Sequence, residues 1–113
     1  TYVVGGTATS GSDFTALSGT VTITAGNTTA TITVPVTDDA IVGGTETVTV
    51  DSLTITSSDP QVTVSDADTP DASLDILDND SATVSVADTT DGNEAGPVDG
   101  VFTVTQTAAA SVD

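Results

Sequence analysis

The chain has 113 residues and carries 17 acidic side chains, but it has no lysine, arginine, histidine or cysteine. Proteins bind nucleic acids and anionic membranes through lysine and arginine, so the net charge of −17 argues against direct contact with either. With no histidine, lysine, cysteine or arginine to serve as a base, nucleophile or oxyanion donor, we expect no enzymatic activity. The length suits one domain with a modest core.

Apolar and polar residues alternate with period two along most of the chain, a pattern that predicts short β-strands. The first predicted strand starts at residue 1 and ends either at Gly5-Gly6 or at Thr9; the others lie at residues 19–24, 29–36, 46–50, 61–64, 73–77, 82–86 and 101–106. No segment has a helical period, and turn residues recur about every 8–12 residues, as in β-sandwiches. The sequence therefore predicts an all-β, antiparallel sandwich of about seven to nine strands.

The acidic residues concentrate where the predicted strands end. These acids are Asp13 in "SGSDF", Asp38 and Asp39 after "TVPV", Asp78 and Asp80 in "LDILDND", and Asp91 and Glu94 in "TTDGNEAG". Loops of a sandwich gather at its two ends, so acids from separate loops can meet and then need a counter-charge. Ca²⁺ fits best, because it takes six to eight oxygen ligands, whereas zinc and copper prefer histidine and cysteine.

Two simpler interpretations of these acids remain open. Each aspartate can cap its own turn, since aspartate is common in turns. Alternatively, the acids can serve as general solvation in a salt-adapted protein, although the predominance of aspartate over glutamate favours loop coordination. The motif "DND" by itself is weak, because it lacks the 12-residue loop of an EF-hand.

Residues 2–50 resemble a known family through "GGTATSGSDFTALSGTVTITAGNTTATITVPVTDDAIVGGTETVTV". This run is similar to Calx-beta domains, immunoglobulin-like β-sandwich modules that bind calcium in sodium–calcium exchangers, integrin subunits and large bacterial surface proteins. The resemblance implies a set of calcium ligands near a domain junction: Asp13, Asp38, Asp39, Asp78, Asp80 and Glu94. One position departs from the family pattern: Gly43 stands where the family usually has a glutamate, and Glu46 compensates in part.

The segment "ATVSVADTTDGNEAGPVDGVFTVTQ" resembles the first two strands of the family, yet here it follows the body of the module. We therefore divide the chain into a repeat body at 1–81, which ends in the "DND" linker, and the first two strands of the following repeat at 82–113. The ending "AAASVD" would run naturally into another "TYVVGGTA", as in one period of a tandem array. A body without its own first strands exposes a sheet edge. We expect Val84, Val86, Phe102 and Val104 to pack in the next repeat or subunit.

These features favour a secreted, cell-surface structural repeat of a bacterial filament or giant adhesin. Its partners would be identical repeats or subunits, joined head-to-tail by strand addition and stiffened by Ca²⁺ at the junctions. One alternative is a regulatory calcium sensor. Another is an adhesin module for glycan or ice, which the threonine rows "TVTIT" and "TATIT" would serve.

Overall fold

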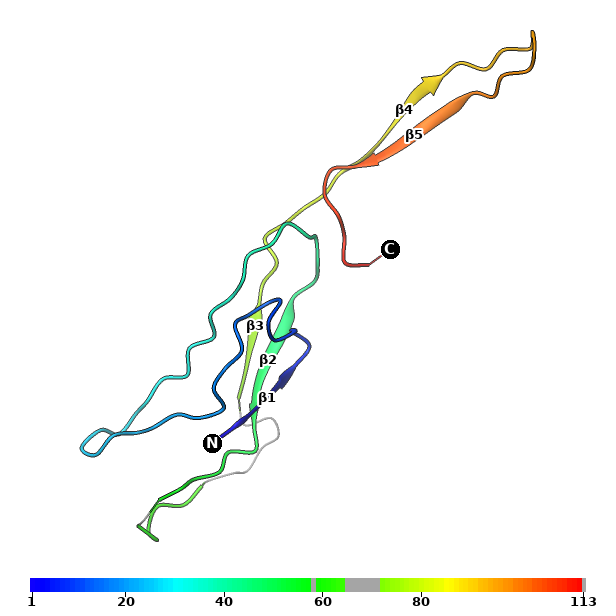
Figure 1. Cartoon of the computed structure of the whole chain (residues 1–113). Coiled ribbons are helices and arrows are strands. Elements are labelled where there is room, and N and C mark those ends of the chain that lie inside the picture. Colours follow the sequence, from blue (N-terminus) through cyan, green and yellow to red (C-terminus); the bar gives the residue numbers. More distant parts are fainter. Residues whose placement is uncertain (58, 65–71, 113) are drawn as a thin grey trace. The chain divides into compact units, whose positions relative to one another are not determined.

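The computed structural model describes residues 1–57, 59–64 and 72–112 (Figure 1). Within these residues the expected all-β class is confirmed, with two antiparallel sheets. The strands are β1 (Val3–Gly6), β2 (Glu46–Asp51), β3 (Ala72–Ile76), β4 (Val84–Thr90) and β5 (Val101–Gln106). None of the described segments forms a helix that could cross a membrane.

The chain forms two compact units. The first comprises Thr1–Asp38 and Thr45–Leu77, and the second comprises Asp39–Gly44 and Asp78–Asp113. The sequence places a boundary after residue 81, whereas the second unit already starts at Asp78 and also takes in the loop at residues 39–44.

In the first unit, β2 is the central strand of a three-stranded sheet with the order β1-β2-β3. Val48 of β2 pairs with Gly6 on one side and with Leu74 on the other. The β-branched residues of β2 suit such a central position, because their side chains pack well on a pleated surface. Gly6 has a φ of +108°, and a Cβ there would lie 2.1 Å from the carbonyl oxygen of Thr47. The edge strand β1 therefore requires glycine at its last residue.

The apolar core of the described residues is small and lies in the first unit. Only Tyr2, Phe14 and Val48 are buried among the hydrophobic side chains, with exposed fractions of 7%, 1% and 2%. Side chains that the sequence places inside, such as Ile23 and Val36, are 57% exposed. The unit therefore leaves much of its apolar surface in contact with solvent.

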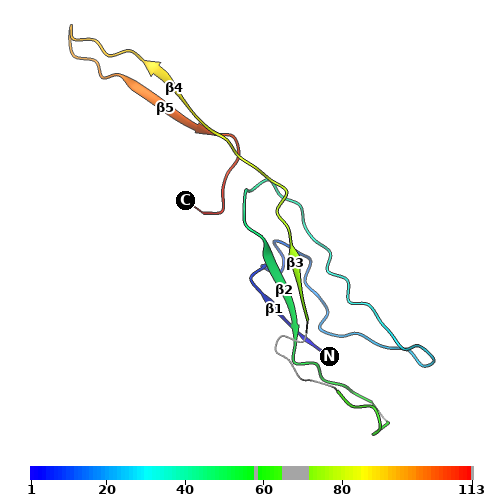
Figure 2. The ribbon, with the colours of Figure 1, turned by 180° about the vertical axis from the view of Figure 1, so that it is seen from behind.

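The predicted strands at 19–24 and 29–36 do not form ladders. At their base, Phe14 bridges Val36, with hydrogen bonds from Thr15 N to Pro35 O (2.9 Å) and from Thr37 N to Asp13 O (2.8 Å). Beyond this bridge the two segments run apart and meet again only at the turn at residues 25–27 (Figures 1 and 2). The alternating pattern is present, but a strand forms only where a partner supplies its hydrogen bonds. The predicted strand at 61–64 likewise forms none.

In the second unit, β4 and β5 form an antiparallel hairpin with a bulge between Asp88 and Thr90. Mutual main-chain hydrogen bonds between Asn93 and Val98 close its turn. The strand predictions at 82–86 and 101–106 are confirmed here, and those at 46–50 and 73–77 are confirmed as β2 and β3.

Candidate functional site

The carboxylate of Asp78 holds two stretches of the second unit together. Its Oδ2 accepts a hydrogen bond from the amide of Gly43 at 2.7 Å, and its Oδ1 accepts one from the amide of Asp80 at 3.0 Å. The Asp80 amide, followed by the Gly43 amide, lowers the pKa of Asp78 below its ordinary value of 3.8, while partial desolvation opposes the shift. Asp78 therefore stays ionised and fixes the loop at 39–44 against the "DND" motif.

Residues 109–111 also form main-chain hydrogen bonds with the loop at residues 39–44. Val42 N donates to Ala109 O at 2.8 Å, and Ser111 N donates to Val42 O at 3.0 Å. Within the loop, Oδ1 of Asp39 accepts a hydrogen bond from Ile41 N at 2.8 Å, which is an aspartate turn. Three separate stretches of sequence thus meet around residues 39–44.

In the first unit, Asp13 lies in the turn before Phe14 and is half-buried. Its Oδ2 accepts a hydrogen bond from Thr9 N at 2.5 Å, and its carbonyl accepts one from Thr37 N. The second bond places the Asp13 main chain beside the residue that precedes Asp38. The structure thus brings the main chains at these two predicted ligands close together.

Glu46 and Glu94 occupy different kinds of position. Glu46 begins β2, is half-buried and pairs with Ile76 across the sheet. Glu94 lies in the turn beyond the Asn93–Val98 bridge, at the end of the β4–β5 hairpin remote from Asp78 (Figure 1). A single copy of the second unit therefore does not bring Glu94 next to Asp78.

The predicted ligands fit calcium in donor chemistry, because all are carboxylates. The positions of these carboxylates, however, do not form a complete calcium site. Among residues 1–57, 59–64 and 72–112, no three acidic side chains come close enough together to hold a metal ion. A full coordination shell would need further oxygen ligands, such as water or carboxylates from a neighbouring copy.

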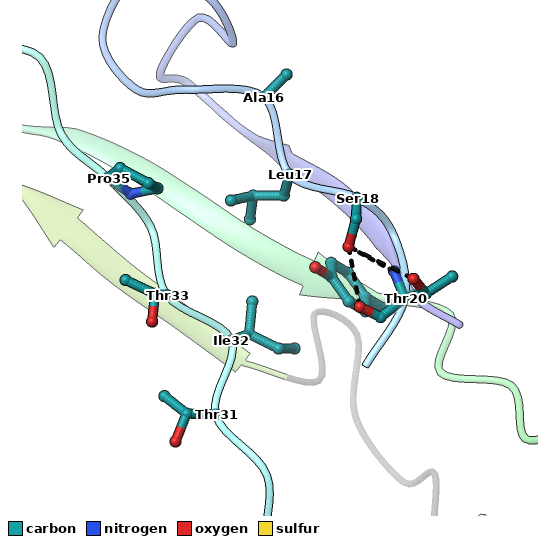
Figure 3. A pocket seen from close by; sticks show the side chains of 9 residues that line it. Ala16, Leu17, Ser18, Thr20, Thr31, Ile32, Thr33 and Pro35 are labelled. Atoms are coloured by element: carbon teal, nitrogen blue, oxygen red, sulfur yellow. Dashed lines mark hydrogen bonds between the residues drawn. The ribbon is translucent and has the colours of Figure 1, made fainter. Parts of the chain in front are cut away.

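Two surfaces away from the acidic residues are open to a partner, one a groove lined by both apolar and hydroxyl side chains and the other an apolar face of a hairpin. The first is a groove of about 250 Å³ in the first unit, which we call the acceptor groove. Its lining residues are Tyr2, Ala16, Leu17, Ser18, Thr20, Thr31, Ile32, Thr33 and Pro35. Leu17 and Ile32 point into the space between their two segments (Figure 3). A signal was present in the sequence, because residues 14–37 contain no acidic side chain.

The second surface is one face of the β4–β5 hairpin, which we call the donor face. Val84, Val86, Phe102 and Val104 share it through the register of the two strands. Their side chains are 67%, 66%, 76% and 68% exposed. The sequence identified these four residues as apolar packing residues, and in this chain they lie open to solvent.

A family model described as the Calx-beta domain matches residues 2–90 of the chain. Comparison with curated proteins and with solved structures produced no match. Calx-beta domains are non-catalytic β-sandwich modules associated with calcium binding. The match covers most of the sequence and includes residues 2–50, which carry the resemblance. This chain belongs to the Calx-beta domain family.

Proposed function

We propose that this chain is a calcium-binding structural repeat of an extracellular bacterial filament or giant adhesin. Copies or repeats join head-to-tail, each contributing its β4–β5 hairpin to a neighbour by strand addition. The observation that carries this proposal is the exposed donor face, because a soluble protein rarely leaves a row of large apolar side chains uncovered without a partner.

The hairpin itself supports this assembly. Two strands alone are marginally stable in water, and they gain stability when an apolar face packs against another layer. In β4–β5 the paired residues Val86 and Val104 lie on the donor face, whereas Ala87 and Thr103 lie on the opposite face. One face is thus apolar and the other is suited to water. A head-to-tail contact of this kind extends into a filament instead of closing into a ring or dimer.

Calcium would supply the positive charge that the sequence lacks. We propose calcium ligands in each unit separately, Asp13 and Asp38 in the first and Asp39, Asp78 and Asp80 in the second. Glu94 would join from a neighbouring copy, because its own hairpin places it far from Asp78, and Glu46 is the remaining candidate. Extracellular calcium modules typically bind with a Kd of about 10⁻⁴–10⁻³ M, which suits a surface protein.

The test is thermal unfolding in EDTA and in CaCl₂ at matched ionic strength, together with size measurement by light scattering. Calcium at a hundredfold excess over Kd stabilises a one-site protein by about 2.7 kcal/mol. We expect a rise in Tm that NaCl does not reproduce, and particles that grow with protein concentration.

The same measurements can also contradict the proposed calcium sites or the proposed assembly. Equal stabilisation by calcium and sodium would mean that the acids are only screened, and would contradict the calcium sites. A chain that stays monomeric at all concentrations, with and without calcium, would contradict the assembly.

A further inference from the structure

We propose that the acceptor groove of the first unit receives the β4–β5 hairpin of a second copy of this chain, through the donor face. This inference rests on the proposed head-to-tail assembly and identifies the two surfaces that meet. The groove lies between residues 16–20 and 31–35, and Tyr2 forms part of its wall. It would be filled by Val84, Val86, Phe102 and Val104 of the incoming hairpin.

The groove offers both apolar contacts and unused main-chain groups. Leu17 and Ile32 are half-buried, and both point toward the open space (Figure 3). Within the described part of the chain, residues 20–24 and 29–34 belong to no strand. The one main-chain hydrogen bond recorded between residues 20 and 34 closes the turn, from Asn27 N to Thr24 O. The Ser18 hydroxyl already binds both main-chain groups of Thr20. The donors and acceptors that an added strand requires are therefore those of residues 21–23 and 29–34.

The pattern of the acceptor segments also fits strand addition. Residues 19–24 and 29–36 alternate apolar and polar residues as strands do, yet they form no ladder, and Val36 alone among them is bridged, to Phe14. An incoming strand would supply the missing partner and turn the alternation into a regular sheet face. The same event would cover Val36 and Ile23, each 57% exposed in the single chain.

The distribution of charge selects a second copy as the occupant. Residues 14–37, 81–87 and 100–112 contain no acidic side chain, although the chain carries 17 in total. Asp88 is the one acid in the two strands of the hairpin, and it lies at the end of the donor face, opposite Phe102. Two molecules of charge −17 repel each other, so without a bound cation close contact between copies is favoured only at uncharged surfaces. The acceptor segments and most of the donor face are such surfaces.

Two blocked variants test the pairing directly. Val104→Asp places a charge on the donor face, and Ile32→Asp places one in the acceptor groove. Each should weaken self-association by about a hundredfold or more, because assembly would bury an unpaired carboxylate. The matched controls are Thr103→Asp, on the opposite face of β5, and Thr22→Asp, an exposed residue outside the groove. Both controls should assemble like the unmodified chain.

An equimolar mixture of the two blocked variants gives the decisive result. Each variant keeps one intact surface, so the mixture should form a 1:1 dimer that does not grow, measured by light scattering. Tyr2 gives a second readout, since the chain has no other tyrosine and no tryptophan. The fluorescence emission of Tyr2 should change in the mixture but in neither variant alone. Circular dichroism of each variant alone checks that both are folded.

Cysteine substitutions give a test that does not depend on the charged variants. The chain has no cysteine, so Thr33→Cys copies mixed with Val104→Cys copies should form a disulfide dimer under oxidation. Thr103→Cys copies should do so much more slowly. If the unmodified chain polymerises but neither the blocked pair nor the cysteine pair joins, the groove assignment is wrong and the proposed assembly uses another surface. If the unmodified chain never self-associates, the proposed assembly and this inference fail together.

Discussion

The side chain of Asp78 accepts a hydrogen bond from the main-chain amide of Gly43 at 2.7 Å, across 35 residues of sequence. Its other carboxylate oxygen accepts one from the amide of Asp80 at 3.0 Å. A side chain with two acceptor oxygens is needed to make both bonds, one to the loop at 39–44 and one within "DND". This relationship makes Asp78 a structural residue of the second unit, whether or not it also binds calcium.

Asp78→Asn should loosen the loop at 39–44. Asparagine offers one acceptor oxygen where aspartate offers two, so either Gly43 N or Asp80 N loses its partner. We expect the Gly43 amide to exchange with solvent several-fold faster, measured in calcium-free buffer by hydrogen exchange. Asp91→Asn removes the same charge from the same unit and should leave this rate unchanged. An unchanged rate in Asp78→Asn would contradict the role of the carboxylate.

The loop should also open as the pH falls. Because the pKa of Asp78 is lowered in the folded chain, its contribution to stability is fully present above 3.8 and is lost as the pH falls through the folded-state pKa. We expect the Gly43 amide NMR signal to titrate below pH 3.8. Global melting is a poor readout, since protonation of the other acids relieves repulsion and acts in the opposite direction. In Asp78→Asn the titration of this signal should disappear.

Gly6→Ala should destabilise the β1–β2 pairing. The φ of +108° is unfavourable for alanine, and its Cβ would lie 2.1 Å from Thr47 O. We expect a loss of about 1–3 kcal/mol or more in the free energy of unfolding, measured by denaturant titration. Gly26→Ala is the matched control, because Gly26 also has a positive φ, +89°, but has nothing within 4 Å. Equal effects of the two substitutions would show that the close approach to Thr47 carries no cost.

Truncation of Phe14 should lower the stability of the monomer, whereas truncation of Phe102 should weaken association between copies. Phe14 is 1% exposed, so Phe14→Ala should lower the free energy of unfolding of the dilute monomer by about 3–5 kcal/mol. Phe102 is 76% exposed, so Phe102→Ala should leave the dilute monomer nearly unchanged. At concentrations where the chain assembles, Phe102→Ala should instead weaken association. A strong loss of monomer stability in Phe102→Ala would show that this side chain packs within its own chain.

The sequence predicted the fold class well because alternation and turn residues act locally. The runs around Val48, Leu74, Val86 and Val104 all became strands. The sequence was less successful for the runs that contain Ile23 and Ile32, which have the same alternation but form no ladder. Whether such a run pairs depends on another segment, and period-two patterning carries no information about which segment that is.

For the candidate site, the sequence determined the donor type and the turn positions of the aspartates. It also identified the apolar residues of the hairpin, because hydrophobic residues in alternation indicate a packed face. Only the tertiary structure decided that Asp78 binds the Gly43 amide and that Glu94 lies in the turn of its hairpin. It alone also decided that a groove lies between the segments around Leu17 and Ile32. These features join residues distant in sequence, and their geometry follows from how the chain folds back on itself rather than from local patterning.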